Sequence, residues 1–209
     1  MITQIGLKMS NLKQNLGDSY SNGFDDANEQ IKLYGKWETY TKDICEEAGW
    51  LGPLKTTQYV IDNVDVRHEI ADLACGPGPG GEILWRKGYA NVDGYDLTEA
   101  FLEKAKQHYR NVGVIDIVKQ PLPKQYDIIL ASGVFTKGHL SSAPAENIAN
   151  SLKENGLLII TTPYMDDYDY IAESGWDKQT FLTQVECIGP WPSLVTTHQH
   201  YHYLRVYRK

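Results

Sequence analysis

Glu69-Ile70-Ala71-Asp72-Leu73-Ala74-Cys75-Gly76-Pro77-Gly78-Pro79-Gly80-Gly81 is the stretch of sequence that decides the fold. A short apolar run leads into a loop with four glycines, and an amphipathic segment follows. This pattern predicts a strand over Ile70–Leu73, a tight turn, and a helix over Gly80–Lys87. Glycines at such a turn permit positive φ angles and a close approach of a ligand to the main chain. Because ligands of open α/β sheets bind outside the carboxyl ends of the strands, the loop predicts a site for a nucleotide-like cofactor.

The composition limits the classes of protein that the chain can represent. Its 209 residues favour one domain with a substantial core, and a formal net charge of −7 argues against nucleic acid as a partner. Three cysteines, Cys45, Cys75 and Cys187, form no CxxC pair and no disulfide framework. With no apolar leader and no run long enough to span a bilayer, we expect a cytoplasmic protein with no membrane partner. The oligomeric state is left open.

The part of the chain before the first strand is expected to hold an arm and a helical cap. Residues 1–30 are polar and predict a mobile N-terminal arm. Between Ile31 and Ala48, apolar and aromatic residues recur at three- and four-residue intervals, which predicts an unusually aromatic helical face. Gly49-Trp50-Leu51-Gly52-Pro53 ends this helix, and a second helix is expected from Leu54 to about Asn63.

Alternating strands and helices follow the glycine-rich loop. Helices are expected after Thr98 and from Ser141-Ser142-Ala143-Pro144 to Gly156, and a helix or turn around Trp176–Gln179. The expected strands are Val92–Tyr95, Val112–Ile115, Tyr126–Ala131, Leu157–Thr162, Val185–Ile188 and His202–Tyr207. The sequence therefore predicts an α/β fold: a Rossmann-like, doubly wound seven-stranded sheet, mostly parallel, with a C-terminal antiparallel hairpin. A single domain would span 31–209, with a helical cap at 31–68 and the Rossmann-like core at 69–209.

The glycine motif alone does not identify the cofactor. Gly76-x-Gly78-x-x-Gly81 also satisfies the dinucleotide fingerprint, and Asp96 follows Gly76 by 20 positions, where a carboxylate can accept both ribose hydroxyls. Three features favour S-adenosylmethionine over a nicotinamide. About 68 residues precede the first strand, a second acid (Asp116) ends the third strand, and a hairpin replaces a second nucleotide-binding half.

Two motifs resemble those of class I S-adenosylmethionine-dependent methyltransferases. Asp72-Leu-Ala-Cys-Gly-Pro-Gly-Pro-Gly80 is similar to motif I, and Gly94-Tyr-Asp96-Leu-Thr-Glu is similar to motif II. Further segments are similar to the Williams–Beuren-region methyltransferase-like proteins: Tyr34-Gly-Lys-Trp37-Glu-Thr-Tyr40, Gly49-Trp-Leu-Gly-Pro53, Asp127-Ile-Ile-Leu-Ala-Ser-Gly-Val-Phe-Thr-Lys-Gly-His139 and Asn155-Gly-Leu-Leu-Ile-Ile-Thr-Thr162. The resemblance covers roughly residues 31–165.

The resemblance implies a set of cofactor-binding residues and S-adenosylhomocysteine as the product. Asp72 would hold the methionine amino group, Asp96 the ribose hydroxyls, and Tyr34, Trp37 and Tyr40 would form a lid whose π faces suit a sulfonium cation. The other implied positions are Ala74, Gly76 and Gly78 along the methionyl and ribose portions, Leu97, Asp116 and Ile117 at the adenine, and Ala131 and Ser132 at the sulfonium edge. Aromatic residues at helical spacing more often belong to the hydrophobic core than to a lid, so both interpretations of Tyr34, Trp37 and Tyr40 stay open.

His139, just past the fourth predicted strand, is the candidate general base, with a solvated loop histidine as the alternative. Tyr164 is the second candidate catalytic residue, and Asp166, Tyr168, Trp191, His198 and His200 are candidates for the acceptor pocket. His198, His200 and His202 share one face of a strand, but without a nearby cysteine or carboxylate they predict no metal site. The expected function is methyl transfer to a small-molecule acceptor. The alternatives are a protein methyltransferase and a cofactor-binding module without transferase activity.

Overall fold

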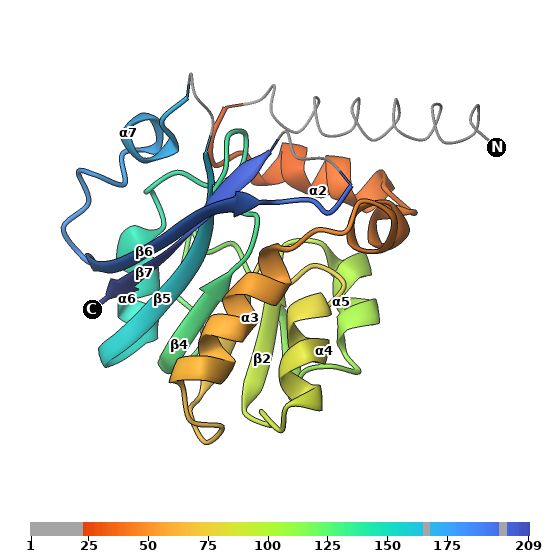
Figure 1. Cartoon of the computed structure of the whole chain (residues 1–209), viewed down its shortest axis with the longest axis horizontal. Coiled ribbons are helices and arrows are strands. Elements are labelled where there is room, and N and C mark those ends of the chain that lie inside the picture. The colour runs from red at the N-terminus through yellow and green to blue at the C-terminus, as the bar shows by residue number, and fades with distance from the viewer. Residues whose placement is uncertain (1–22, 165–167, 197–199) are drawn as a thin grey trace.

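The computed structural model describes residues 23–164, 168–196 and 200–209, and its centre is one seven-stranded sheet with helices on both faces (Figure 1). The strand order is β3-β2-β1-β4-β5-β7-β6. The strands are β1 Ile70–Leu73, β2 Val92–Asp96, β3 Asn111–Val114, β4 Tyr126–Ala131, β5 Leu152–Tyr164, β6 Thr183–Pro192 and β7 Tyr201–Arg208. Strands β1 to β5 pair in parallel, and β7 is antiparallel to both β5 and β6. The predicted Rossmann-like sheet and its C-terminal hairpin are confirmed.

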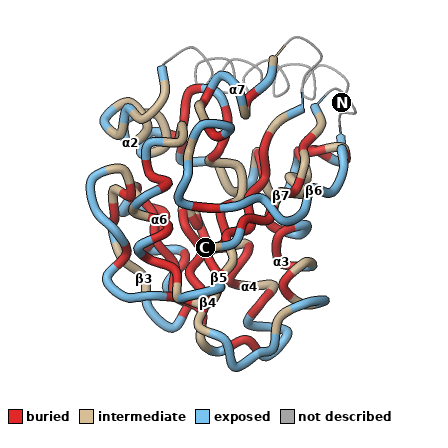
Figure 2. The backbone as a smooth tube through the Cα atoms, turned by 90° about the vertical axis from the view of Figure 1, so that its left-hand side faces the viewer, coloured by how far each residue is buried: buried red, intermediate tan, exposed pale blue. Residues whose placement is uncertain are grey.

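The described helices pack around this sheet. They are α2 Ala27–Lys36, the π-helix Thr41–Glu47, α3 Gly52–Asn63, α4 Pro79–Arg86, α5 Glu99–Ala105, α6 Ala145–Ser151 and α7 Tyr170–Ser174. Viewed along its edge, the sheet is a buried layer between the helices (Figure 2). Within the described part of the chain, no helix is both long enough and apolar enough to cross a membrane.

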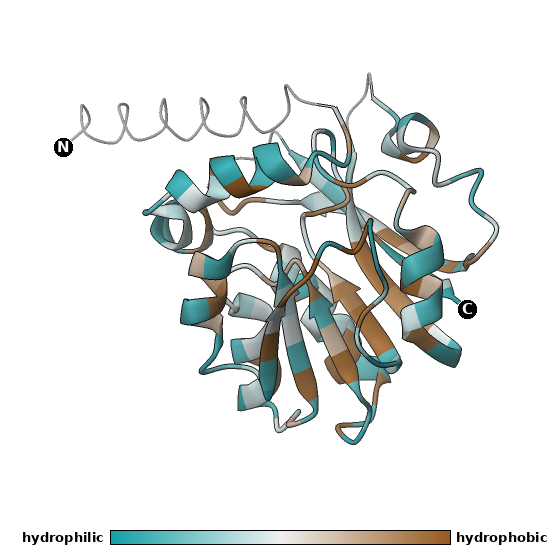
Figure 3. Ribbon diagram, turned by 180° about the vertical axis from the view of Figure 1, so that it is seen from behind, coloured by the Kyte–Doolittle hydropathy of each residue, from teal (hydrophilic) through white to brown (hydrophobic). Residues whose placement is uncertain are grey.

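The core has two halves, one on each face of the sheet. Strand β4 supplies both, because Ile129 belongs to one buried cluster while Ile128 and Leu130 belong to the other. Side chains of successive strand residues point to opposite faces, so an uninterrupted apolar strand covers both halves. Burial of each such side chain stabilises the fold by roughly 1.5–3 kcal/mol. Hydrophobic residues accordingly concentrate on the strands (Figure 3).

The helical cap differs from the prediction of a single helix from Ile31 to Ala48. Helix α2 begins at Ala27, inside the range assigned to the arm, because the Asp26 carboxylate accepts a hydrogen bond from the Glu29 N–H (3.1 Å). It ends at Lys36, and the π-helix starts only at Thr41. The Asp43 carboxylate fixes the break, since it accepts hydrogen bonds from the Trp37 indole (2.8 Å) and the Thr39 hydroxyl (2.6 Å). Residues 1–22 lie outside the described part.

One further prediction along the second half of the chain was wrong. Gly156 does not close α6, because the helix ends at Ser151 and β5 starts at the next residue. Gly156 instead lies where a Cβ would come 2.9 Å from the Lys153 carbonyl oxygen and 3.1 Å from that of Asp127. The helix or turn expected around Trp176–Gln179 is a turn at 175–178, which follows helix α7, whose first turn is capped by the Asp169 side chain.

Candidate active site

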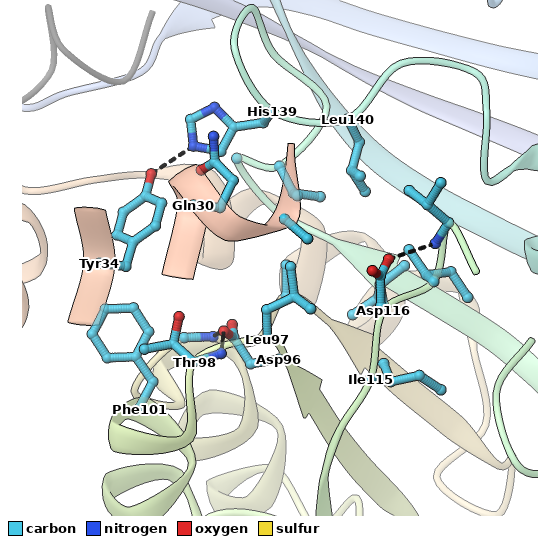
Figure 4. Close-up of a pocket in the computed structure, with 18 of the residues that line it drawn as sticks. Gln30, Tyr34, Asp96, Leu97, Thr98, Phe101, Ile115, Asp116, His139 and Leu140 are labelled. Carbon is cyan, nitrogen blue, oxygen red and sulfur yellow. Dashed lines mark hydrogen bonds between the residues drawn. The ribbon is translucent and has the colours of Figure 1, made fainter. Parts of the chain in front are cut away.

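A pocket of about 850 Å³, including the space at its mouth, opens at the carboxyl ends of β1, β2 and β4 (Figure 4). Helix α2 and the segment 132–140 form the opposite wall. The lining residues are Asp25, Asp26, Ala27, Gln30, Tyr34, Tyr40, Leu73, Ala74, Gly76, Asp96, Leu97, Thr98, Phe101, Ile115, Asp116, Ile117, Val118, Ser132, Gly133, Val134, His139 and Leu140. A smaller hollow of about 390 Å³ adjoins it and shares Tyr40, Ala74, Gly76 and Ser132 with it.

The glycine-rich loop contributes one glycine to both pockets. Gly76 has a φ of +55°, and a Cβ built on it would meet no atom within 4 Å, so a ligand can approach its main chain. The later glycines serve packing: a Cβ on Gly80 would reach the Asp72 carboxylate, and one on Gly81 would lie less than 3.0 Å from the Tyr109 ring. Gly78, which packs on Ala105, lines neither pocket.

Asp96 connects the end of β2 to the glycine-rich loop. One of its carboxylate oxygens accepts the Gly76 N–H and the other accepts the Thr98 N–H, both at 2.8 Å. Burial raises the pKa of Asp96, although these hydrogen bonds favour its charged form. Each carboxylate oxygen has two lone pairs and can therefore accept another donor, such as a hydroxyl group.

Asp72 lies beneath the loop in a second buried network. The Tyr109 hydroxyl donates to its carboxylate (2.6 Å) and accepts the Gly81 N–H (3.0 Å). Burial, with a smaller contribution from the nearby Asp96 carboxylate, raises the pKa of Asp72 to about 7, while the Tyr109 hydrogen bond opposes the shift. A cationic group placed beside Asp72 would relieve this cost by favouring the ionised carboxylate.

Helix α2 is attached to the segment after β4 by three side chains. The Tyr34 hydroxyl lies 2.6 Å from Nε2 of His139, and the Gln30 amide donates to the Gly138 carbonyl. Asp25 accepts the Ser141 N–H (3.0 Å), and its own N–H donates to the His139 carbonyl (2.7 Å). Figure 4 shows Gln30, Tyr34 and His139 together on one side of the pocket, opposite Asp116 and Ile115. The segment after β4 is thus held by α2, which covers the pocket.

Most of the sequence-predicted site residues come together here. The two pockets are lined by Tyr34, Tyr40, Asp72, Ala74, Gly76, Asp96, Leu97, Asp116, Ile117, Ser132 and His139. His139 is 7% exposed, so the alternative of a solvated loop histidine does not hold.

Four predicted site residues, and several of the acceptor-pocket candidates, line neither pocket. The four are Gly78, Trp37, Ala131 and Tyr164. Trp37 stacks on Tyr34, and Ala131 is buried in the core. Tyr164 is 40% exposed and packs on Tyr203. Among the acceptor candidates, Trp191 is buried beside His202, while Asp166 and His198 lie outside the described residues.

Sequence reasoning missed several lining residues in α2, just before α2 and in α5. Asp25, Asp26 and Gln30 line the pocket from within the range assigned to the arm. The Asp26–Glu29 cap was the available signal, since an aspartate three residues before a glutamate is typical of a helix start. Phe101 was recognised as part of a helical face, but its position at the pocket depends on the tertiary packing of α5.

The charge of the lining restricts what the pocket can hold. Its charged residues are Asp25, Asp26, Asp96 and Asp116, and the described lining contains no lysine or arginine. Within the described residues, no group of three or more histidine, cysteine or acidic side chains is arranged to hold a metal ion. The pocket therefore suits a ligand that is neutral or positively charged and rich in hydrogen-bond donors. The sulfonium, the ammonium and the two ribose hydroxyls of S-adenosylmethionine fit these residues.

Comparison with known proteins agrees with this geometry. Residues 71–160 match the family described as "Methyltransferase domain". The methyltransferase GfsG of Streptomyces halstedii is 25% identical, over 91% of this chain and 74% of its own length. Malonyl-[acyl-carrier protein] O-methyltransferase of Halalkalibacterium halodurans is 32% identical, over 54% of this chain and 45% of its own length, so the chain spans less than half of that relative. The solved TehB-like SAM-dependent methyltransferase of Corynebacterium glutamicum superposes with a TM-score of 0.63 at 17% identity, covering 85% of this chain and 98% of that one.

The chain has a Rossmann-like fold, and its residues 71–160 match a methyltransferase domain. The protein is an S-adenosylmethionine-dependent methyltransferase, and S-adenosylmethionine is its cofactor.

Proposed function

We propose that this enzyme transfers the methyl group of S-adenosylmethionine to a small-molecule acceptor that is neutral or cationic. The observation that carries the proposal is the lining of the large pocket, whose charged side chains are four carboxylates without a described basic residue. A phosphorylated or carboxylated acceptor would find no charge partner there, whereas a neutral molecule gains from the apolar walls formed by Phe101, Val134 and Leu140.

The positions of the lining residues support the cofactor-binding roles that the resemblance implies. Asp96 would accept the ribose hydroxyls, and Leu97, Asp116 and Ile117 would surround the adenine. In the smaller hollow, Asp72, Ala74 and Gly76 would hold the methionine portion, with Tyr40 and Ser132 near the sulfonium. The Ser132 hydroxyl is fixed by Thr56 at 2.9 Å, which gives this end a defined shape. The sequence similarity to the Williams–Beuren-region methyltransferase-like proteins supports the same assignment. Membership of that subfamily stays a prediction.

The cofactor supplies an electrophilic methyl group on its sulfonium. The chain's own residues hold the acceptor in line with the S–CH3 bond and exclude water, and alignment of this kind supplies much of the rate of bimolecular reactions. Helix α2 would contribute to the exclusion, because its residues Ala27, Gln30 and Tyr34 line the pocket.

Calorimetry with S-adenosylhomocysteine tests the cofactor site. The Asp96→Asn variant is expected to bind it about 10- to 100-fold more weakly, since hydrogen bonds to a charged group contribute about 1.5–3 kcal/mol. Asp62→Asn, on an exposed part of α3 away from the pocket, is the matched control and should bind like the parent. Equal binding by the Asp96 variant, or binding of NAD(H) in place of S-adenosylhomocysteine, would contradict the assignment.

Transfer of labelled methyl from S-adenosylmethionine tests the acceptor class. A small-molecule metabolite extract and a protein extract are each incubated with the enzyme and the labelled donor. Label in the small-molecule fraction alone supports the proposal. Label in protein would favour the protein methyltransferase alternative, and no label with intact cofactor binding would favour the non-catalytic binding module.

A further inference from the structure

Two ring nitrogens of His139 have defined partners in the pocket wall, and together they fix its tautomer. Nδ1 lies 3.3 Å from the Lys137 carbonyl oxygen, and Nε2 lies 2.6 Å from the Tyr34 hydroxyl. A carbonyl oxygen only accepts, so Nδ1 carries the proton in the neutral ring. Nε2 is then unprotonated and accepts the hydrogen bond that Tyr34 donates. Burial lowers the pKa of His139 to about 4, so the ring is neutral near pH 7.

This direction of the hydrogen bond gives Tyr34 a role beyond the lid that the sequence predicts. The Tyr34 hydroxyl donates its proton toward the histidine while its oxygen keeps its capacity to accept, and both residues line the pocket. His139 is 7% exposed, and Nε2, its only unprotonated nitrogen, is directed to Tyr34. An acceptor in the pocket can therefore reach the histidine through the tyrosine.

Gln30 adds a second polar group beside this pair. Its amide nitrogen is fixed on the Gly138 carbonyl, and its Oε1 is buried with no hydrogen-bond partner among the described residues. An unsatisfied buried acceptor destabilises the free protein, and a donor on a bound molecule would offset that cost. Figure 4 shows this side chain next to the His139 ring, on the same side of the pocket as Tyr34.

We propose that Tyr34 is a catalytic residue that takes the proton from an acceptor hydroxyl, with His139 as the positioning residue behind it, and that Gln30 Oε1 binds a second N–H or O–H donor of the same acceptor. The proposal rests on the proposed methyltransferase function and specifies its substrate class: neutral small molecules whose reacting hydroxyl has a neighbouring hydrogen-bond donor.

The step balances in atoms and charge. The acceptor oxygen forms a bond to the methyl carbon while the C–S bond breaks and leaves its electron pair on sulfur. The hydroxyl proton passes to the Tyr34 oxygen as the Tyr34 proton passes to His139 Nε2. The products are a methyl ether, S-adenosylhomocysteine and an imidazolium, which replaces the positive charge of the sulfonium. Burial disfavours the imidazolium, so its proton leaves to solvent before the next turnover.

The tautomer is measured by ¹⁵N NMR on the full chain labelled in histidine, with His139→Gln identifying the resonances of residue 139. We expect Nδ1 to be protonated and Nε2 to be a hydrogen-bonded, unprotonated nitrogen whose resonance moves in Tyr34→Phe. A protonated Nε2 would overturn the relay, since the histidine would then donate to Tyr34 and could not take its proton. An Nε2 resonance that is unchanged in Tyr34→Phe would overturn it equally.

The methylated atom is determined from the labelled small-molecule product. A methyl group on oxygen supports the relay, whereas one on nitrogen, sulfur or carbon overturns it and leaves the proposed function intact. Absence of any product would refute the proposed function and the relay together, so the two failures are distinguishable.

Kinetics with that acceptor separate the role of Tyr34 from that of Gln30. Tyr34→Phe should lower kcat by about 10²- to 10⁴-fold, the range for loss of general acid–base catalysis, with S-adenosylhomocysteine binding within about threefold of the parent. Gln30→Met should mainly raise KM. Tyr59→Phe, whose hydroxyl contacts Glu186 away from the pocket, is the control and should match the parent. A Tyr34→Phe enzyme with parental kcat would refute the proposal.

Discussion

Replacing Asp72 by asparagine should remove a pH dependence of stability that the parent protein has. The carboxyl is buried, and its pKa is raised from 3.8 to about 7, mainly by desolvation. In the unfolded chain the group titrates near its ordinary value. Between these two pKa values the folded protein binds a proton that the unfolded chain has released. The stabilising contribution of this proton is complete below pH 3.8 and is lost as the pH rises through about 7.

The size of the effect follows from the shift. Each pH unit between the two pKa values changes the free energy of unfolding by about 1.4 kcal/mol for one proton. Asp72 should therefore cost the parent about 2 kcal/mol of stability between pH 5 and pH 7, which is a large fraction of the 5–15 kcal/mol typical of a domain. Asparagine has nearly the same shape and does not titrate, so the variant lacks this contribution.

Urea unfolding of both proteins at pH 5, 6 and 7 measures the effect as a difference. His139 and His202 have pKa values lowered to about 4 and about 3 by burial, and they act in the opposite sense. Their contribution is present above pH 6.5 and is lost as the pH falls, but it cancels when the variant is compared with the parent. The variant should gain about 2 kcal/mol relative to the parent from pH 5 to pH 7. A constant difference would refute the assignment of the raised pKa.

Other substitutions test the packing that supports the site. Arg110→Met should destabilise the fold by about 2 kcal/mol in chemical unfolding, because it leaves the buried Asp93 carboxylate without its 2.7 Å partner; a cost near zero would show that Lys124 alone suffices. Gly81→Ala should cost about 1–3 kcal/mol, since its Cβ would overlap the Tyr109 ring. Gly35→Ala, in the open part of α2, is the matched change and should be neutral or stabilising by up to about 1 kcal/mol; equal losses in both would argue against the clash.

The strands were predictable because their signals are local. The limits of β1 and β4 agree with the sequence prediction, since short apolar runs between turn residues define a buried strand without help from distant residues. The alternation with helices then fixes a parallel sheet, and the absence of a helix between the last two strands predicts the hairpin. These features need no knowledge of tertiary contacts.

The glycine-rich loop was predicted as a cofactor loop, but the sequence could not assign its glycines individually. Gly78 and Gly81 both match the fingerprint, yet each packs against the α5 region, at Ala105 and Tyr109 respectively. Tyr109 follows Gly81 by 28 positions, so only the folded structure shows that the two meet. A motif match therefore does not distinguish a glycine that admits a ligand from one that admits a neighbouring side chain.

The same limit explains why the two ends of α2 were predicted incorrectly, and these ends matter for the chemistry. Its aromatic spacing continues past Lys36, so periodicity alone extends the helix, and the break depends on the Asp43 carboxylate. Tyr34 meets His139 across 105 positions of sequence. In our proposal, the helix that covers the pocket also carries the side chains that bind the acceptor. Variation along this one helix would then change the acceptor while the β1 and β2 loops keep the cofactor, which separates specificity from cofactor binding.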